Sequence, residues 1–186
     1  MDIFSAFGLS ASAGLNAYIP LLIVGLLARY TNTIKLSPPW DTLTDPWVLL
    51  VLAVLLLVEI VADKIPAVNH ANDIVQSFIR PVAGAIVFAA SSHIITNINP
   101  VLAMICGLFV AGVVHGAKAL AIRPAVTVAT GGAANPVVST VEDVLATVLS
   151  ITAVLIPVVL GALICILAAW VIWMIWRRIN RESQKA

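Results

Sequence analysis

Long apolar runs restrict the possible folds of this chain more than any other feature of its sequence. They recur from residue 7 to residue 176, and a helix needs about 20 apolar residues to cross the roughly 30 Å hydrocarbon core of a bilayer. Of the 186 residues, 61% are hydrophobic and only 10% are charged, whereas soluble domains average about 25% charged residues. The sequence therefore predicts an all-α fold, a polytopic helical membrane bundle, and excludes a soluble class.

The runs predict five to six membrane segments within a single integral-membrane domain, 1–186. The expected segments are 7–29, 47–65, 69–95, 100–122 and 141–176. The last stretch makes about 54 Å of helix, and we expect one long helix kinked at Pro157 there rather than two spans. Between the last two segments, 122–136 is short and rich in glycine and proline, which predicts a half-helix or re-entrant segment.

A faint internal repeat suggests a further level of organisation. GLSASAGLNAYIP (8–20) aligns without gaps to GVVHGAKALAIRP (112–124), matching at Gly, two Ala and Pro. A true repeat divides the chain into halves, 1–97 and 98–176, of three segments each. Because the number of segments is odd, the halves are then inverted in the membrane. Inverted repeats with broken helices are typical of transporters, whose sites lie at the repeat interface.

Charge and cysteine content indicate how the chain is oriented in the membrane and which partners it can have. Basic residues in the tail, 177–186, place the C-terminus in the cytoplasm by the positive-inside rule. A net charge of +1 indicates neither nucleic acid nor an acidic partner. Cys106 and Cys165 have no disulfide or metal-binding spacing, and no cofactor is expected. The expected partners are the lipid bilayer and a small solute or ion, with a homo-oligomer left open.

Nine ionisable residues nevertheless lie within or beside the spans. A charge at the bilayer centre costs about 2.5–3.5 kcal/mol on insertion scales, so these groups must pair, face a wet cavity or lie near the interface. Five acids against four bases suit mutual pairing. The nine residues are Glu59, Asp63, Lys64, Asp73, Arg80, Lys118, Arg123, Glu142 and Asp143.

The spacing of these residues narrows their arrangement. Glu59 and Asp63 are i,i+4 neighbours and share one helix face, and two carboxylates this close can hold a shared proton or a cation. His115 and Lys118 are i,i+3 neighbours, and His115 lies within the GxxxG packing motif of 112–116. A polar stripe at i, i+3, i+4 and i+7 is formed by Asp73, Gln76, Ser77 and Arg80.

Structural interpretations stay open for several of these residues. Asp73 can cap the start of its helix, and Ser139-Thr140-Val141-Glu142 matches a capping box. Asp143 can instead extend further into the membrane. Lys64 can extend to the interface. His115 can serve as an interhelical hydrogen-bonding group. For the Glu59 and Asp63 pair and the polar stripe we favour function, because intramembrane ionisable groups are functional candidates by default.

Five stretches of the sequence resemble a known family. They are AGLNAYIPLL (13–22), E-x-x-x-DKIP (59–66) followed by ND (72–73), FIRPVAGA (78–85), HGAKALAIRPAV (115–126) and NPVVSTVED (135–143). The family comprises small integral-membrane proteins of bacteria, with plant relatives, and is labelled a domain of unknown function (DUF4126). The resemblance implies a multi-pass protein of the cell membrane, the inner membrane in a bacterium, and brings no activity with it.

The favoured function is a small membrane transporter or channel for an ion or small polar solute. Asp63 and Asp73 are the candidate proton or cation sites, and Arg80, Lys118 and Arg123 balance them or hold an anionic substrate. The full candidate site is Glu59, Asp63, Lys64, Asp73, Arg80, His115, Lys118, Arg123 and Asp143.

Two alternatives remain. One is a membrane enzyme acting on a phosphate-bearing lipid, with acids holding Mg²⁺ and basic residues holding phosphate. Glu59-x-x-x-Asp63 faintly resembles the acidic pair of bacterial undecaprenyl-diphosphate phosphatases, but the Ser/Arg-rich phosphate loop of those enzymes is missing, which makes this the weaker interpretation. The other is a structural or assembly subunit whose charges pair internally, which predicts that paired neutralisation of an acid and its basic partner is tolerated.

Overall fold

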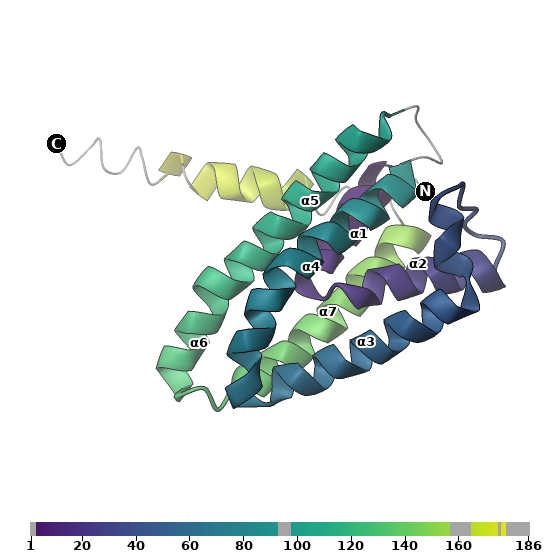
Figure 1. Cartoon of the computed structure of the whole chain (residues 1–186). Helices are drawn as coiled ribbons and strands as arrows, with labels where there is room; N and C mark the ends of the chain where they lie inside the picture. The colour runs from purple at the N-terminus through teal and green to yellow at the C-terminus, as the bar shows by residue number, and fades with distance from the viewer. Residues whose placement is uncertain (1–2, 93–97, 157–164, 175, 178–186) are drawn as a thin grey trace.

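The computed structural model describes residues 3–92, 98–156, 165–174 and 176–177, and the elements in them are helical (Figure 1). This confirms the predicted all-α fold for these residues. In chain order the elements are α1 Ile3–Leu15, α2 Tyr18–Tyr30, the 3-10 turn η1 Trp40–Thr44, α3 Pro46–Lys64, α4 Pro66–Ser92, α5 Pro100–Ala117, the π-helical turn η2 Lys118–Ile122, α6 Arg123–Thr130 and α7 Asn135–Leu155. A shorter helix, Cys165–Met174, follows.

Four helices in the described part of the chain are long and apolar enough to cross a membrane. They are Pro46–Lys64, Asn72–Ser91, Pro100–Thr130 and Asn135–Leu155. Only 22% of the apolar window in the first and third of these is buried inside the protein, so their aliphatic side chains cover an outer surface that suits lipid. The chain is therefore built as a membrane protein, although the finer prediction of five to six segments is not confirmed.

The predicted span at 7–29 is wrong, because the helix breaks at its middle. α1 and α2 have 13 residues each, about 20 Å of helix, which is too short to cross roughly 30 Å of hydrocarbon. α1 runs parallel to α5: Ala6 and Ala103 pack in one cluster near the starts of the two helices. At the other end, Lys118 Nζ, just after α5, donates to the Leu15 carbonyl at the end of α1.

α2 then returns toward the end of the bundle where α1 began. α3, α4 and α5 alternate in direction, so α3 and α5 begin at the same end (Figure 1). Arg29, in the last turn of α2, donates to the Thr44 carbonyl just before α3. α1 and α2 thus form a hairpin of half-length helices, the α1–α2 hairpin, whose tip at Asn16 and Ala17 lies inside the bundle.

The re-entrant segment predicted at 122–136 is also wrong. The helix that begins at Pro100 continues through η2 and α6 to Thr130. The π-helical turn adds a residue to one turn immediately before Pro124, whose ring and missing N–H a regular helix does not accommodate. Gly131 and Gly132, with φ of 62° and 85°, then reverse the chain into α7.

Two further expectations concern the halves and the last stretch. The aligned segment 8–20 lies on α1 and α2, and 112–124 lies on α5, η2 and the first two residues of α6, while α1 and α5 run in the same direction. The inverted halves are therefore not confirmed. In the stretch 141–176, α7 begins earlier than expected and ends at Leu155, and the kink expected at Pro157 lies outside the described residues.

Small residues set the closest helix contact, between α4 and α5. A Cβ added at Gly84 would overlap the Ala111 Cβ and would lie 2.8 Å from the Gly107 carbonyl oxygen. The GxxxG motif of 112–116 does not make this contact: a Cβ at Gly112 would find its nearest neighbour at 3.9 Å, and one at Gly116 would meet nothing within 4 Å. Gly107 and Ala111, four residues apart on α5, form the packing face instead.

Candidate functional site

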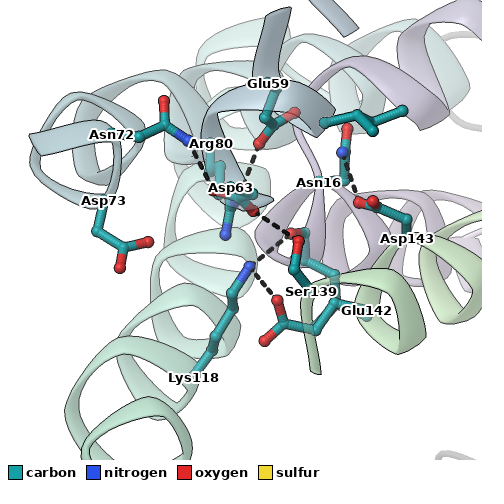
Figure 2. A network of polar contacts seen from close by, with 12 residues as sticks. Asn16, Glu59, Asp63, Asn72, Asp73, Arg80, Lys118, Ser139, Glu142 and Asp143 are labelled. Carbon is teal, nitrogen blue, oxygen red and sulfur yellow. Dashed lines mark hydrogen bonds and ion pairs between the residues drawn. The ribbon is translucent and has the colours of Figure 1, made fainter. Parts of the chain in front are cut away.

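Charged side chains from α3, α4, η2 and α7 converge in one half of the bundle, next to the tip of the α1–α2 hairpin (Figure 2). Arg123 from α6 joins them through its ion pairs. We call this set, together with the polar groups bonded to it, the charged network. Its members lie at the end of α3, in the first half of α4, at the end of α5 and in η2 and α6, and at the start of α7. These four chain regions are distant in sequence, and the helix packing brings them together.

Arg123 links three acidic residues. Its Nη1 lies 2.7 Å from both carboxylate oxygens of Asp73. Its Nη2 lies 3.0 Å from Asp63 Oδ2 and 3.3 Å from Glu142 Oε2. The planar guanidinium offers donors in fixed directions that one lysine ammonium does not match, so Arg123 ties α3, α4 and α7 to the last third of the long α5–α6 helix.

Lys118 connects the network to the hairpin. Its Nζ pairs with Glu142 Oε2 at 2.6 Å and donates to the Leu15 carbonyl at 3.2 Å. That carbonyl belongs to the last residue of α1, where helix carbonyls lack partners and the helix dipole is negative. The lysine ammonium therefore satisfies a helix end that would otherwise be buried without a donor.

Arg80 forms the second cationic centre. It is fully buried, and its Nη2 lies 2.8 Å from Glu59 Oε1 and 3.9 Å from Asp63 Oδ2. Its Nη1 lies 3.3 Å from His115 Nδ1. A guanidinium only donates, so His115 Nδ1 accepts, and Nε2 carries the ring proton toward Ser77 Oγ at 3.0 Å. His115 thus joins α5 to α4, as the structural interpretation proposed.

Asp63 is the most heavily bonded carboxylate of the network. Asn72 Nδ2 donates to its Oδ1 at 2.7 Å, and Ser139 Oγ donates to its Oδ2 at 3.1 Å. With the bond from Arg123, both oxygens are satisfied by donors from three different helices. Hydrogen bonds of this kind favour the ionised form of a carboxylate.

Asn16 forms the tip of the hairpin. Its Oδ1 accepts from the backbone N–H groups of Tyr18 and Ile19 at 3.0 and 3.2 Å, which caps the start of α2. Its Nδ2 donates to Asp143 Oδ1 at 2.9 Å. The break in the first apolar run is therefore satisfied at both helix ends, by Lys118 on α1 and by Asn16 on α2.

The structure brings most of the predicted site residues together but not Lys64. Lys64 is exposed, and its Nζ has a long 3.4 Å contact with the carbonyl of Ile60 on its own helix. The capping interpretations of Asp73 and Glu142 are wrong. α4 begins at Pro66 and α7 at Asn135, so both residues lie inside their helices and both pair with Arg123.

Sequence reasoning missed the polar residues that complete the network. These are Asn16, Asn72 and Ser139. The signal for Asn16 was an amide inside a run of otherwise apolar or small residues, directly before the Pro20 turn of α2. Ser139 lies four residues after Asn135 and one turn before Asp143, on the face of α7 that also carries Glu142.

The charges of the ion-paired set do not cancel. Within the described residues the set has four carboxylates and three cations, which leaves one surplus negative charge. The carboxylates are those of Glu59, Asp63, Asp73 and Glu142, and the cations are Arg80, Lys118 and Arg123. Among the same residues no group of three or more His, Cys, Asp or Glu side chains is placed to hold a metal ion.

An apolar groove of about 600 Å³ lies between α2, α3 and α7, beside the hairpin. Its charged lining residues are Lys64 and Asp143, and its walls are mostly aliphatic, including Ile19, Ile23 and Ile60. Such walls suit a hydrocarbon chain of the bilayer rather than a polar solute. The groove therefore brings lipid-facing surface close to Asp143 and leaves the ion pairs enclosed.

Comparison with known proteins places the chain in a family. A model of the family described as a domain of unknown function (DUF4126) matches residues 3–177. The match spans nearly the whole chain, including every helix of the charged network, and the protein belongs to this family. No curated protein and no solved structure matches the chain.

Proposed function

We propose that this protein is a small membrane transporter or channel for an ion or small polar solute, and that the charged network is its site. The observation that carries the proposal is the meeting of the α1–α2 hairpin tip with a buried set of ion pairs. Helices broken inside the membrane, with their ends facing a charged site, are the usual way in which transporters build a binding site. Ionisable residues inside a membrane are costly to bury and are therefore functional candidates by default.

The arrangement favours a proton or cation over an anion as the transported or coupled species. All three cations of the network are in ion pairs with carboxylates at 2.6 to 3.3 Å, so an anionic substrate would have to displace an acid. The surplus negative charge instead fits one positive charge. Arg80, Lys118 and Arg123 accordingly serve to balance the acids.

The structural-subunit interpretation remains the competing function, because a complete set of ion pairs also suits a purely structural role. The two differ in their response to paired neutralisation. Lys118→Met combined with Glu142→Gln removes a cation and an anion that contact each other at 2.6 Å. A structural network tolerates this change, whereas a transport site loses a group whose charge the transported species requires.

Flux measurements on the purified protein in liposomes test the proposal. Gradients of H⁺, Na⁺ and K⁺ are imposed separately, and internal dyes report each ion. We expect the wild type to dissipate at least one gradient. Asp63→Asn and Asp73→Asn should slow that flux at least about tenfold, equivalent to about 1.4 kcal/mol. Lys64→Gln, an exposed residue outside the network, is the matched control and should retain wild-type flux.

Two results would contradict the proposal. One is flux that persists unchanged in both Asp63→Asn and Asp73→Asn, which removes the network from the pathway. The other is a wild type that moves none of these ions while the Lys118→Met/Glu142→Gln double variant keeps wild-type thermal stability. That combination supports the structural role, because the ion pair would then be dispensable for everything measured.

A further inference from the structure

Buried polar atoms without partners gather at one corner of the charged network. In the described part of the chain, five buried side-chain N or O atoms have no hydrogen-bond partner. Three of them are Glu59 Oε2, Gln76 Oε1 and Arg80 Nε. Gln76 and Arg80 are one turn apart on α4, and Arg80 holds the other oxygen of Glu59. A buried polar group without a hydrogen bond destabilises the fold, so the corner has unused hydrogen-bonding capacity.

Glu59 and Asp63 differ sharply although they are one turn apart on α3. Asp63 accepts hydrogen bonds on both oxygens, from Asn72, Ser139 and Arg123. Glu59 accepts one bond, from Arg80, and its Oε2 has none. Hydrogen bonds to a carboxylate favour its ionised form. Of the two acids, Glu59 is therefore the one whose ionised form is less supported.

Charged and titratable groups lie near Glu59 on several helices. Arg80 pairs with it from α4, Asp63 lies one turn along its own helix, and α7, which also packs against α3, carries Glu142 and Asp143. Tyr18 from α2 and Lys118 from η2 are further titratable neighbours, and His115 approaches through its contact with Arg80. Arg80 is shared with Asp63, so the Glu59 carboxylate has no cation to itself.

We propose that Glu59 is the group in the network that binds and releases a proton, at Oε2, and that the proton is the coupling ion of this protein. A proton on Glu59 cancels the surplus negative charge of the ion-paired set. It also converts Oε2 from an acceptor into a donor, and Gln76 Oε1 is a buried acceptor in need of one. The coupling role rests on the proposed transport function, whereas the proton site itself does not.

Protonation also gives the network two states. With Glu59 neutral, Arg80 loses its closest ionic partner at 2.8 Å and keeps Asp63 at 3.9 Å. Asp63 is in turn bonded to Arg123, which holds Asp73 and Glu142. A proton bound at one corner thus changes the partners of a chain of ion pairs that reaches the hairpin through Lys118.

The sequence permits a direct test, because it contains only three glutamates, Glu59, Glu142 and Glu182. Protein made with glutamate labelled with ¹³C at the side-chain carboxyl gives three carboxyl signals in a pH titration by NMR in lipid nanodiscs. Glu142→Gln and Glu182→Gln assign two of the signals, and Glu59 follows by elimination without a change at Glu59. We expect the Glu59 signal to show a protonated carboxyl at a pH at which the Glu182 signal is that of a carboxylate.

Proton flux into liposomes, compared between wild type and Glu59→Gln, is measured in parallel. The inference predicts at least a tenfold loss in Glu59→Gln. Two results overturn the inference: a Glu59 carboxyl that is ionised at every pH at which Glu182 is ionised, or proton flux that is unchanged in Glu59→Gln. If the protein still moves ions, the proposed transport function stands in either case. A titrating Glu59 in a wild type that moves no protons upholds the proton site and overturns its coupling role. Flux of another ion in that case leaves transport itself standing.

Discussion

α4 and α5 are held together in two different ways along their length. In one half, Gly84 faces Gly107 and Ala111, so closely that an added methyl group would overlap its neighbour. In the other half, Arg80 and Ser77 of α4 contact His115 of α5 through hydrogen bonds. Lipid provides little hydrophobic drive for helices to associate, so close van der Waals packing of small residues and polar contacts must supply it.

This difference indicates which half of the α4–α5 contact can adopt more than one arrangement. Close packing of small side chains has one arrangement, because any movement opens a void or a clash. A chain of ion pairs with a surplus acid has several arrangements, since a proton or a cation can redistribute the pairs. The small-residue half is therefore expected to act as a frame, and the charged half as the part that responds to a ligand.

The largest effect is expected from removing the central cation of the charged half. Arg123→Met leaves two buried carboxylates, Asp63 and Glu142, and the partly buried Asp73 without their shared partner. Breaking a buried ion pair in this way typically costs about 3–5 kcal/mol. We expect at least this loss in unfolding experiments in detergent. The loss should shrink as the pH falls, because protonated carboxyl groups need no counter-cation.

Arg29→Met is the matched control for this change. Arg29 is exposed and donates one hydrogen bond to the Thr44 carbonyl, so its loss should cost less than about 1.5 kcal/mol and should not depend on pH in the same way. Equal losses for the two variants, or a loss in Arg123→Met that does not change with pH, would show that the carboxylates around Arg123 are not held as anions.

A smaller effect is expected from disturbing the frame. Gly84→Ala places a Cβ against Ala111 and the backbone of Gly107, and overpacking of this kind costs about 1–3 kcal/mol. Gly112→Ala, whose added Cβ meets its nearest atom, the Pro81 ring of α4, at 3.9 Å, should be neutral within about 0.5 kcal/mol. Thermal unfolding of the two variants compares them directly. A neutral Gly84→Ala would mean that α4 and α5 can separate without loss of stability.

The two halves also differ in how well the sequence predicted them. The spans that became α3, α4 and α5 followed from apolar length alone, and the α3 bounds were predicted to within one residue at each end. For the nine charged residues the sequence left three arrangements open, namely pairing, a wet cavity or the interface, and the ion pairs of the described residues include seven of the nine. What pairing pattern they adopt could not be read from the sequence, because Arg123 reaches acids that lie 19, 50 and 60 residues away.

The hairpin shows why the break was predicted in the wrong place. Glycine and proline at 122–136 predict a helix break there, yet a single π-helical turn accommodates Pro124 and the helix continues. At 7–29 the break depends on one amide, Asn16, and on Lys118, whose contact with the Leu15 carbonyl spans 103 residues of sequence. A contact of that range leaves no local pattern, so hydropathy reads the two half-helices as one span.

The sharpest comparison of the two halves uses two helix caps made by asparagine. Asn16 caps α2 inside the bundle, and Asn99 caps α5 at its exposed start, accepting from the Val101 N–H at 2.9 Å. Removing such a cap typically costs about 0.5–2 kcal/mol. We therefore expect Asn16→Ala and Asn99→Ala to lower thermal stability by similar amounts, with a small additional loss at Asn16 from the bond to Asp143.

Function should separate the two variants where stability does not. Asn16 connects the hairpin tip to Asp143. The preceding residue, Leu15, supplies the carbonyl that accepts a hydrogen bond from Lys118. Ion flux in liposomes, measured at a temperature where both variants remain folded, should fall severalfold in Asn16→Ala and stay at the wild-type rate in Asn99→Ala. Equal flux in Asn16→Ala and Asn99→Ala would mean that the hairpin tip has only a structural role. Loss of the cap beside the ion pairs would then affect transport no more than loss of the cap at the exposed start of α5.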